Sequence, residues 1–185
     1  MSTKTKKTIS NNALFQKLLL HLLKEEKGYC FGSFPFSVEG QSFEFERVHR
    51  ALNDLQDKGY VKPVKVPSRG WSSDGHALTV KGERFCDKMK GRNFKAVEKE
   101  LRQGIVRRLG SQLDITKAMH PDCFPKPEGV GTARMDAAID IMIAKEILKK
   151  QMVHSGWFPI DGYALTPKAV QRVNRVKSSH AVLVL

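Results

Sequence analysis

The sequence predicts a mainly helical α+β fold, in which small β-hairpins alternate with helices in two related units. Apolar residues recur three or four positions apart over several stretches, which indicates amphipathic helices. Short β-prone runs beside Gly, Pro and Asp indicate hairpins. One eight-residue word occurs twice, which indicates a duplication. With 41% hydrophobic and 28% charged residues among 185, the chain can bury a core, so disordered, collagen-like and membrane-spanning classes are excluded.

The N-terminal region is expected to contain an arm, a helix and an extended segment. Residues 1–12 hold three lysines, no acid and no hydrophobic periodicity, which favours a flexible basic arm. The first helix is expected from Ala13 to Leu23, where leucines recur at helical spacing before Gly28. Tyr29 to Val38 alternates aromatic residues with Gly, Ser and Pro, so we expect extended backbone here and no second helix before Phe43.

A second helix and a hairpin follow. The helix is expected from Ser42 to Lys58, because apolar residues form one stripe and Gly59 follows as a stop signal. Tyr60 begins a strand, and a second strand covers His76 to Thr79. Between them, Lys62 to Ser73 contains prolines, a glycine and basic residues but no acid, which predicts a long basic loop at the hairpin tip. A short helix then runs from Lys81 to Met89.

The second half begins near residue 93 with a helix around Leu101 and Ile105. Residues 110–131 contain three prolines and are expected to be irregular. The following helix is expected from Met135 to about His154 and is apolar nearly all round, which predicts burial on more than one side.

The most specific pattern is the repeated word. Asp74 to Lys81 (DGHALTVK) and Asp161 to Lys168 (DGYALTPK) match at six of eight positions, and each lies between helices. The match predicts two copies of a helix, strand, strand, helix unit, over residues 13–92 and 93–185, with the loop between the strands almost absent in the second copy. One β-turn preference used twice is the alternative.

The repeated unit resembles a known DNA-binding fold. Leu78 to Gly82 (LTVKG) leaves the second strand, and Lys58 to Tyr60 (KGY) ends the preceding helix. This order and these motifs resemble the winged-helix domains of MarR-like and PadR-like bacterial regulators, over about residues 13–90 and more weakly 95–177. The resemblance implies tandem winged-helix-like units, with the helix before the hairpin as recognition helix and the hairpin as wing.

The charge of the chain favours an acidic polymer as partner. Its formal net charge is +13, of which residues 1–92 carry +7 and residues 93–185 carry +6, so a basic tail does not account for it. Double-stranded DNA is therefore the expected partner, bound in a salt-sensitive way.

Eight residues are the candidate DNA contacts. Arg47, Arg50 and Asn53 lie on the helix face opposite the apolar stripe, where arginine can bond guanine and asparagine adenine. Four acids share that helix and repel phosphates, so we expect the basic wing to contribute more. The wing and the following helix supply Lys62, Lys65, Arg69, Lys81 and Arg84.

Enzyme motifs are absent. The sequence contains no GxxxxGK[ST], HExxH or GxSxG pattern, so we expect no enzyme, no catalytic residue and no cofactor. His120 and Cys123 lack further ligands, and Asp136 and Asp140 are explained by helix solvation, so no metal site is expected. Three widely spaced cysteines indicate reduced thiols in a cytoplasmic protein.

We therefore predict a cytoplasmic DNA-binding protein, a transcriptional regulator of a bacterium or mobile element. A replication or partition initiator with similar tandem units is one alternative. A winged-helix adaptor that binds proteins rather than DNA is another, because the recognition helix is net acidic. The second unit is expected to form a homodimer, since it lacks a wing, has a very apolar helix and ends in the apolar segment 181–185.

Overall fold

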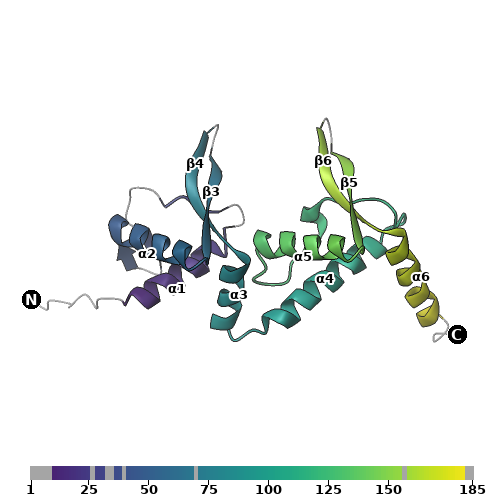
Figure 1. The fold of residues 1–185 in the computed structure, drawn as a ribbon, viewed down its shortest axis with the longest axis horizontal. Coiled ribbons are helices and arrows are strands. Elements are labelled where there is room, and N and C mark those ends of the chain that lie inside the picture. The colour runs from purple at the N-terminus through teal and green to yellow at the C-terminus, as the bar shows by residue number, and fades with distance from the viewer. Residues whose placement is uncertain are drawn as a thin grey trace, which may run out of the picture. The chain divides into compact units, whose positions relative to one another are not determined.

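A computed structural model describes residues 10–25, 28–31, 36–38, 41–68, 71–155 and 158–181 (Figure 1). Helices and three antiparallel two-stranded hairpins make up these ranges, so the protein has a mixed α+β fold. The chain divides into two compact units, Met1–Arg92 with Gly129–Ala133 and Asn93–Glu128 with Arg134–Leu185. No helix in the ranges described has the length and apolar character needed to cross a membrane.

The first unit is organised around a helical core. Its elements are α1 (Asn11–Leu22), β1 (Phe36–Val38), β2 (Gln41–Phe43), α2 (Phe45–Asp57), β3 (Val61–Ser68), β4 (Trp71–Leu78) and α3 (Val80–Met89). Leucines at helical spacing on α1 and α2 are buried against one another, including Leu14, Leu18 and Leu52 at 0% exposure. Helix α1 begins two residues before the predicted start, because the Ser10 side chain accepts a hydrogen bond from the Ala13 amide.

The segment between α1 and α2 is extended, as predicted, where the structure describes it. β1 and β2 form a short hairpin that buries Phe36 and Phe43. Because Gln41–Phe43 pairs with β1, α2 starts at Phe45, and the predicted start at Ser42 is wrong. No helix separates α1 from α2 within the described residues of this segment.

The hairpin β3–β4 is longer than predicted. Val61–Ser68 pairs residue by residue with Trp71–Leu78, so the expected long basic loop is wrong and its lysines lie on a strand. The two prolines of β3 had indicated a loop. His76 exchanges both backbone hydrogen bonds with Tyr29 instead of with Pro63 opposite it, so the missing N–H of Pro63 breaks no bond within the hairpin. Pro67 lies four residues further on and shares that orientation.

The second unit repeats this arrangement. It contains α4 (Phe94–Gly110), the 3-10 turn η1 (Pro121–Cys123), α5 (Thr132–Ala144), β5 (Leu148–Ser155), β6 (Phe158–Leu165) and α6 (Pro167–Ala181), with the first two residues of α5 assigned to the first unit. The predicted helix to His154 is wrong, because α5 ends at Ala144 and the next residues form β5. The second unit thus has a hairpin as long as that of the first, so the expectation that its hairpin is much shorter is also wrong.

A constant offset relates the two units. Phe45 and Thr132, Val61 and Leu148, and Val80 and Pro167 begin equivalent elements, and each pair differs by 87 positions. The same offset relates buried residues of the first helices, which are Leu14, Leu18 and Leu22 in α1 and Leu101, Ile105 and Leu109 in α4. The repeated word is therefore one part of a duplication that covers helix, helix, hairpin and helix.

The junction of each hairpin with its helices is also repeated. The Thr79 hydroxyl donates a hydrogen bond of 2.7 Å to the Gly59 carbonyl, and its amide donates to the Tyr60 carbonyl at 3.0 Å. In the second unit, the Thr166 hydroxyl donates to the Glu146 carbonyl at 2.6 Å. These threonines also cap α3 and α6, so the threonine of each repeated word fixes one hairpin to two helices.

Candidate nucleic-acid interface

Helix α2 presents the predicted recognition residues on one face. Arg47, Arg50 and Asn53 are three residues apart, and all three line a hollow of about 440 Å³ beside α1. Arg50 and Asn53 are exposed, whereas Arg47 is half-buried with its guanidinium carbon 5.9 Å from the centre of the Phe43 ring. The Arg50 Nε donates to the Glu46 carbonyl at 3.4 Å. The structure therefore brings the three residues together.

Acidic side chains surround this face. Glu44, Glu46, Asp54 and Asp57 are all exposed, and Asp54 lines the hollow with the two arginines. Carboxylates at this density repel the phosphates of a duplex. Helix α2 alone is a poor polyanion-binding surface.

The hairpin β3–β4 is the second predicted contact surface. Lys62 and Lys65 are both exposed, but residues an odd number of positions apart on a strand project from opposite faces. Lys65 also forms an ion pair with Asp74 directly across the hairpin, with 2.6 Å between Nζ and Oδ1. The hairpin is therefore a narrow ribbon with a lysine on each face, one of them paired.

The other three predicted residues have separate positions. Arg69 lies outside the described residues. Lys81 is exposed, yet its Nζ donates to the Lys58 carbonyl at 2.6 Å and lies 4.8 Å from the centre of the Tyr60 ring. This ammonium therefore caps the C-terminus of α2. Lys81 itself lies on α3, so the sequence did not indicate this contact. Arg84 is half-buried on α3.

The second hairpin contains basic residues in a stretch that the apolar pattern predicts as a helix. Lys149 and Lys150 are exposed on β5, and Lys150 pairs with Asp161 of β6 at 2.8 Å. The hydrogen bond and the charge of Asp161 raise the pKa of Lys150. Each hairpin thus carries two lysines on its first strand and an aspartate on its second strand. The repeated word predicts a hairpin in this unit, but it does not show that the first strand begins at Leu148 and includes both lysines.

Helix α6 is the most basic of the helices that the structure describes. Its sequence contains Lys168, Arg172, Arg175 and Lys177 and no acid. Lys177 donates to the Gly110 carbonyl at 2.6 Å and thereby caps α4, while Arg172 and Arg175 are exposed. An exposed, acid-free helix surface suits a polyanion better than α2 does.

Helix α5, the counterpart of α2, lacks exposed basic residues. Arg134 corresponds to Arg47 but is 2% exposed, and its Nη2 donates to the Phe94 carbonyl at 3.3 Å. Asp136 and Asp140 correspond to His49 and Asn53 and are exposed. The prediction that this helix is buried on more than one side is wrong, because its buried residues lie on a single face and the other side faces solvent. Its exposed side is acidic and unsuited to contact DNA.

The cysteines carry free thiols, as predicted. Cys86 is buried in the first unit, and burial followed by the Glu83 charge raises the pKa of its thiol to about 12. Among the residues that the structure places, no group of three or more His, Cys, Asp or Glu side chains is arranged to hold a metal ion. His120 Nδ1 lies 3.3 Å from the Asp122 amide and belongs to the local turn at η1.

Comparison with known proteins adds no assignment. No family model matches the chain. No curated protein and no solved structure matches it either.

Proposed function

We propose that this chain is a DNA-binding protein of two winged-helix-like units, a transcriptional regulator that acts in the cytoplasm. The observation that carries the proposal is the recurrence of a basic hairpin, with two lysines on its first strand, at the same place in both units. Hairpins of this kind can enter a groove or follow the phosphate backbone. The net charge of +13 supplies the long-range attraction.

In this proposal the hairpins, and not α2, supply most of the binding free energy. Lys62 and Lys149 form no ion pair with any residue that the structure describes, whereas Lys65 and Lys150 each pair with an aspartate. Phosphates would compete with those aspartates for the two paired lysines. Arg50 and Asn53 on α2 would then add base contacts in the first unit.

Binding of a labelled duplex, followed by fluorescence anisotropy, tests this proposal. The variant Lys62→Ala/Lys65→Ala/Arg69→Ala should lose most of the affinity, because three phosphate contacts disappear together. Glu100→Gln, an exposed change on α4, is the matched control and should bind as the unaltered chain does. Equal affinity of the triple variant and the control would exclude the first hairpin as a contact surface.

Duplex binding and footprinting of the same protein distinguish two other functions. A winged-helix protein adaptor is favoured by the acidic exposed faces of α2 and α5, and it would bind no duplex at any salt concentration. A replication or partition initiator would protect an iterated array rather than the region upstream of its own gene in a footprint.

We also propose that the second unit mediates a homodimer. The exposed large apolar side chains among the described residues are Phe45 in the first unit and Leu113, Ile141, Met152 and Val176 in the second. A second copy would remove such groups from water. Sedimentation of a monomer at micromolar concentration would contradict this dimer.

A further inference from the structure

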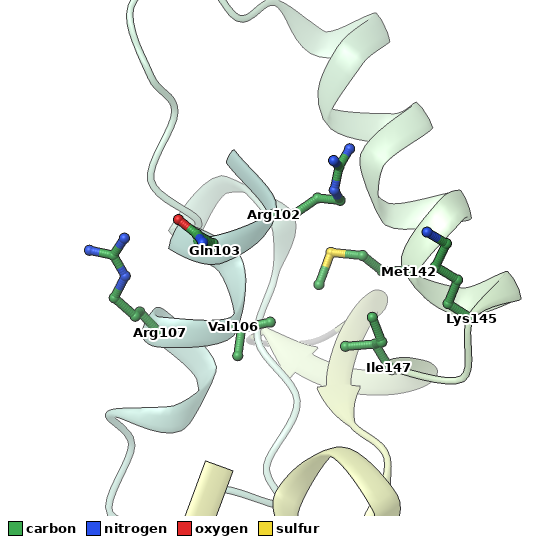
Figure 2. Close-up of a pocket in the computed structure, with 7 residues that line it drawn as sticks. All are labelled: Arg102, Gln103, Val106, Arg107, Met142, Lys145 and Ile147. Atoms are coloured by element: carbon green, nitrogen blue, oxygen red, sulfur yellow. The ribbon is translucent and has the colours of Figure 1, made fainter. Parts of the chain in front are cut away.

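The second unit contains a pocket between α4, the end of α5 and the start of β5 (Figure 2). Its volume is about 440 Å³, which is in the range of pockets that hold small organic ligands. The lining residues are Arg102, Gln103, Val106, Arg107, Met142, Lys145 and Ile147.

The pocket combines an apolar floor with cations. Figure 2 shows the side chains of Val106, Met142 and Ile147 pointing toward one another, with Arg102 and Lys145 beside them. No acid lines the pocket. Neither Arg102 nor Lys145 forms a side-chain hydrogen bond or an ion pair with any residue that the structure describes. Two cations beside an apolar floor favour an occupant that is both apolar and negatively charged.

The first unit shows what fills the same place in the other copy. At an offset of 87 residues, Arg102 corresponds to Phe15, Lys145 to Lys58 and Ile147 to Tyr60. In the first unit, the Lys58 ammonium lies 4.9 Å from the centre of the Phe15 ring. The Tyr60 ring packs 5.0 Å from the Phe85 ring, centre to centre.

These rings are missing from the second copy. Arg102, Ile147 and Arg172 stand at the positions of Phe15, Tyr60 and Phe85. Lys145 has kept the position of Lys58 but has no ring beneath it, and Met142 has kept the buried position of Leu55 at 1% exposure. The pocket is therefore the space that aromatic side chains occupy in the first unit.

We propose that this pocket binds a small aromatic carboxylate. The aromatic ring of the ligand lies on Val106, Met142 and Ile147, where Lys145 contacts its face as Lys58 contacts Phe15. The carboxylate accepts hydrogen bonds from the Arg102 guanidinium, for which its two oxygens are well suited. The site lies within the second unit, so the proposal does not depend on DNA binding.

Titration of the full chain with 2-naphthoate, followed by isothermal calorimetry and by amide NMR shifts, tests the site. The unaltered chain should bind naphthoate, and the neutral analogue 2-naphthamide should bind about 10- to 100-fold more weakly, because it lacks the charge that Arg102 meets. Arg102→Gln should weaken naphthoate by a similar factor and leave the affinity for naphthamide almost unchanged.

A second variant fills the pocket with the residues of the first unit. Arg102→Phe/Ile147→Tyr should abolish naphthoate binding, and its thermal unfolding should show that it remains folded. The matched control is Lys99→Gln, because Lys99 is an exposed cation of the same helix that does not line the pocket, and its loss should change affinity less than about twofold. Absence of naphthoate binding to the unaltered chain would overturn the proposal. So would equal affinity for naphthamide, or undiminished binding by the filled variant.

Discussion

The hydroxyl of Thr166 donates a hydrogen bond of 2.6 Å to the backbone oxygen of Glu146. This bond holds Glu146 at a φ of 55°, in the left-handed region that residues with side chains rarely adopt. The equivalent residue of the first unit is Gly59, at a φ of 71°, for which that conformation carries no strain. The two units therefore make the same turn at different conformational cost.

We predict that Glu146→Gly stabilises the second unit by about 1 kcal/mol, because it removes this strain. The Glu146 carboxylate approaches Lys168 at 3.4 Å, but both side chains are mostly exposed, so losing that pair costs little. Gly59→Ala should destabilise the first unit by a similar amount. Native-state hydrogen exchange, read separately on β5–β6 and β3–β4, measures both changes. A less protected β5–β6 in Glu146→Gly would contradict the strain.

The buried carboxylate of Glu83 binds the segment Gly129–Ala133, which belongs to the first unit although it lies later in the sequence. Glu83 is 2% exposed and accepts a hydrogen bond of 2.7 Å from the Gly131 amide. Glu83→Ala should lower the free energy of unfolding of this unit by about 2 kcal/mol, since it leaves that amide without its acceptor. Glu83→Gln keeps an acceptor oxygen and should cost less. Urea unfolding measures the change, and Glu100→Ala, at an exposed position, is the control. Equal stability of Glu83→Ala and this control would show that the hydrogen bond from Gly131 to Glu83 does not stabilise the unit.

The stability of the first unit should fall as the pH drops below neutral. Burial lowers the pKa of His21 and His76 from the ordinary 6.5, and their Nε2 and Nδ1 atoms respectively are buried without hydrogen-bond partners in the described structure. Between pH 6.5 and the lower pKa of the folded state, the unfolded chain binds more protons, so acidification favours unfolding. We expect the urea midpoint to decrease from pH 7.5 to 5.5, and less steeply in His76→Gln. A midpoint that increases over this interval would show the opposite linkage.

Two aspartates are expected to weaken DNA binding. Asp74 pairs with Lys65 and Asp161 pairs with Lys150. Asp74→Asn and Asp161→Asn should each raise the affinity for duplex DNA by about two- to fivefold, because a lysine is released and a repulsive charge removed. Fluorescence anisotropy measures the change, and Glu100→Gln controls for the loss of any negative charge. Unchanged or weaker binding of both variants would place the hairpins away from the DNA.

Much of the first unit was predictable, because its helices end at glycines and carry clear apolar stripes. The first strand of the second hairpin, β5, was not, since Glu146 stands where a glycine would have marked the end of the helix. The length of β3–β4 was missed for a related reason. Pro63 and Pro67 indicate a loop, and only the pairing of His76 with Tyr29 shows that their missing amides leave the hairpin intact.

The candidate site was predictable in part. Spacing alone placed Arg47, Arg50 and Asn53 on one face, because helical periodicity fixes which residues are neighbours. The cap that Lys81 forms on α2 and the pairing of Lys65 with Asp74 depend on contacts between elements, which a pattern along the chain does not contain. The pocket of the second unit became visible only when equivalent positions of the two units were compared.

The salt dependence of duplex binding tests the central claim most directly. The logarithm of the binding constant should fall linearly with the logarithm of salt concentration, with a slope of about −0.9 for each phosphate contact. In the variant Lys62→Ala/Lys65→Ala/Lys149→Ala/Lys150→Ala, we predict a slope that is shallower by about 2 to 4. The proposal that the two hairpins bind DNA would be contradicted if the chain bound no duplex. It would also be contradicted if the slope were the same in the unaltered chain and in the variant.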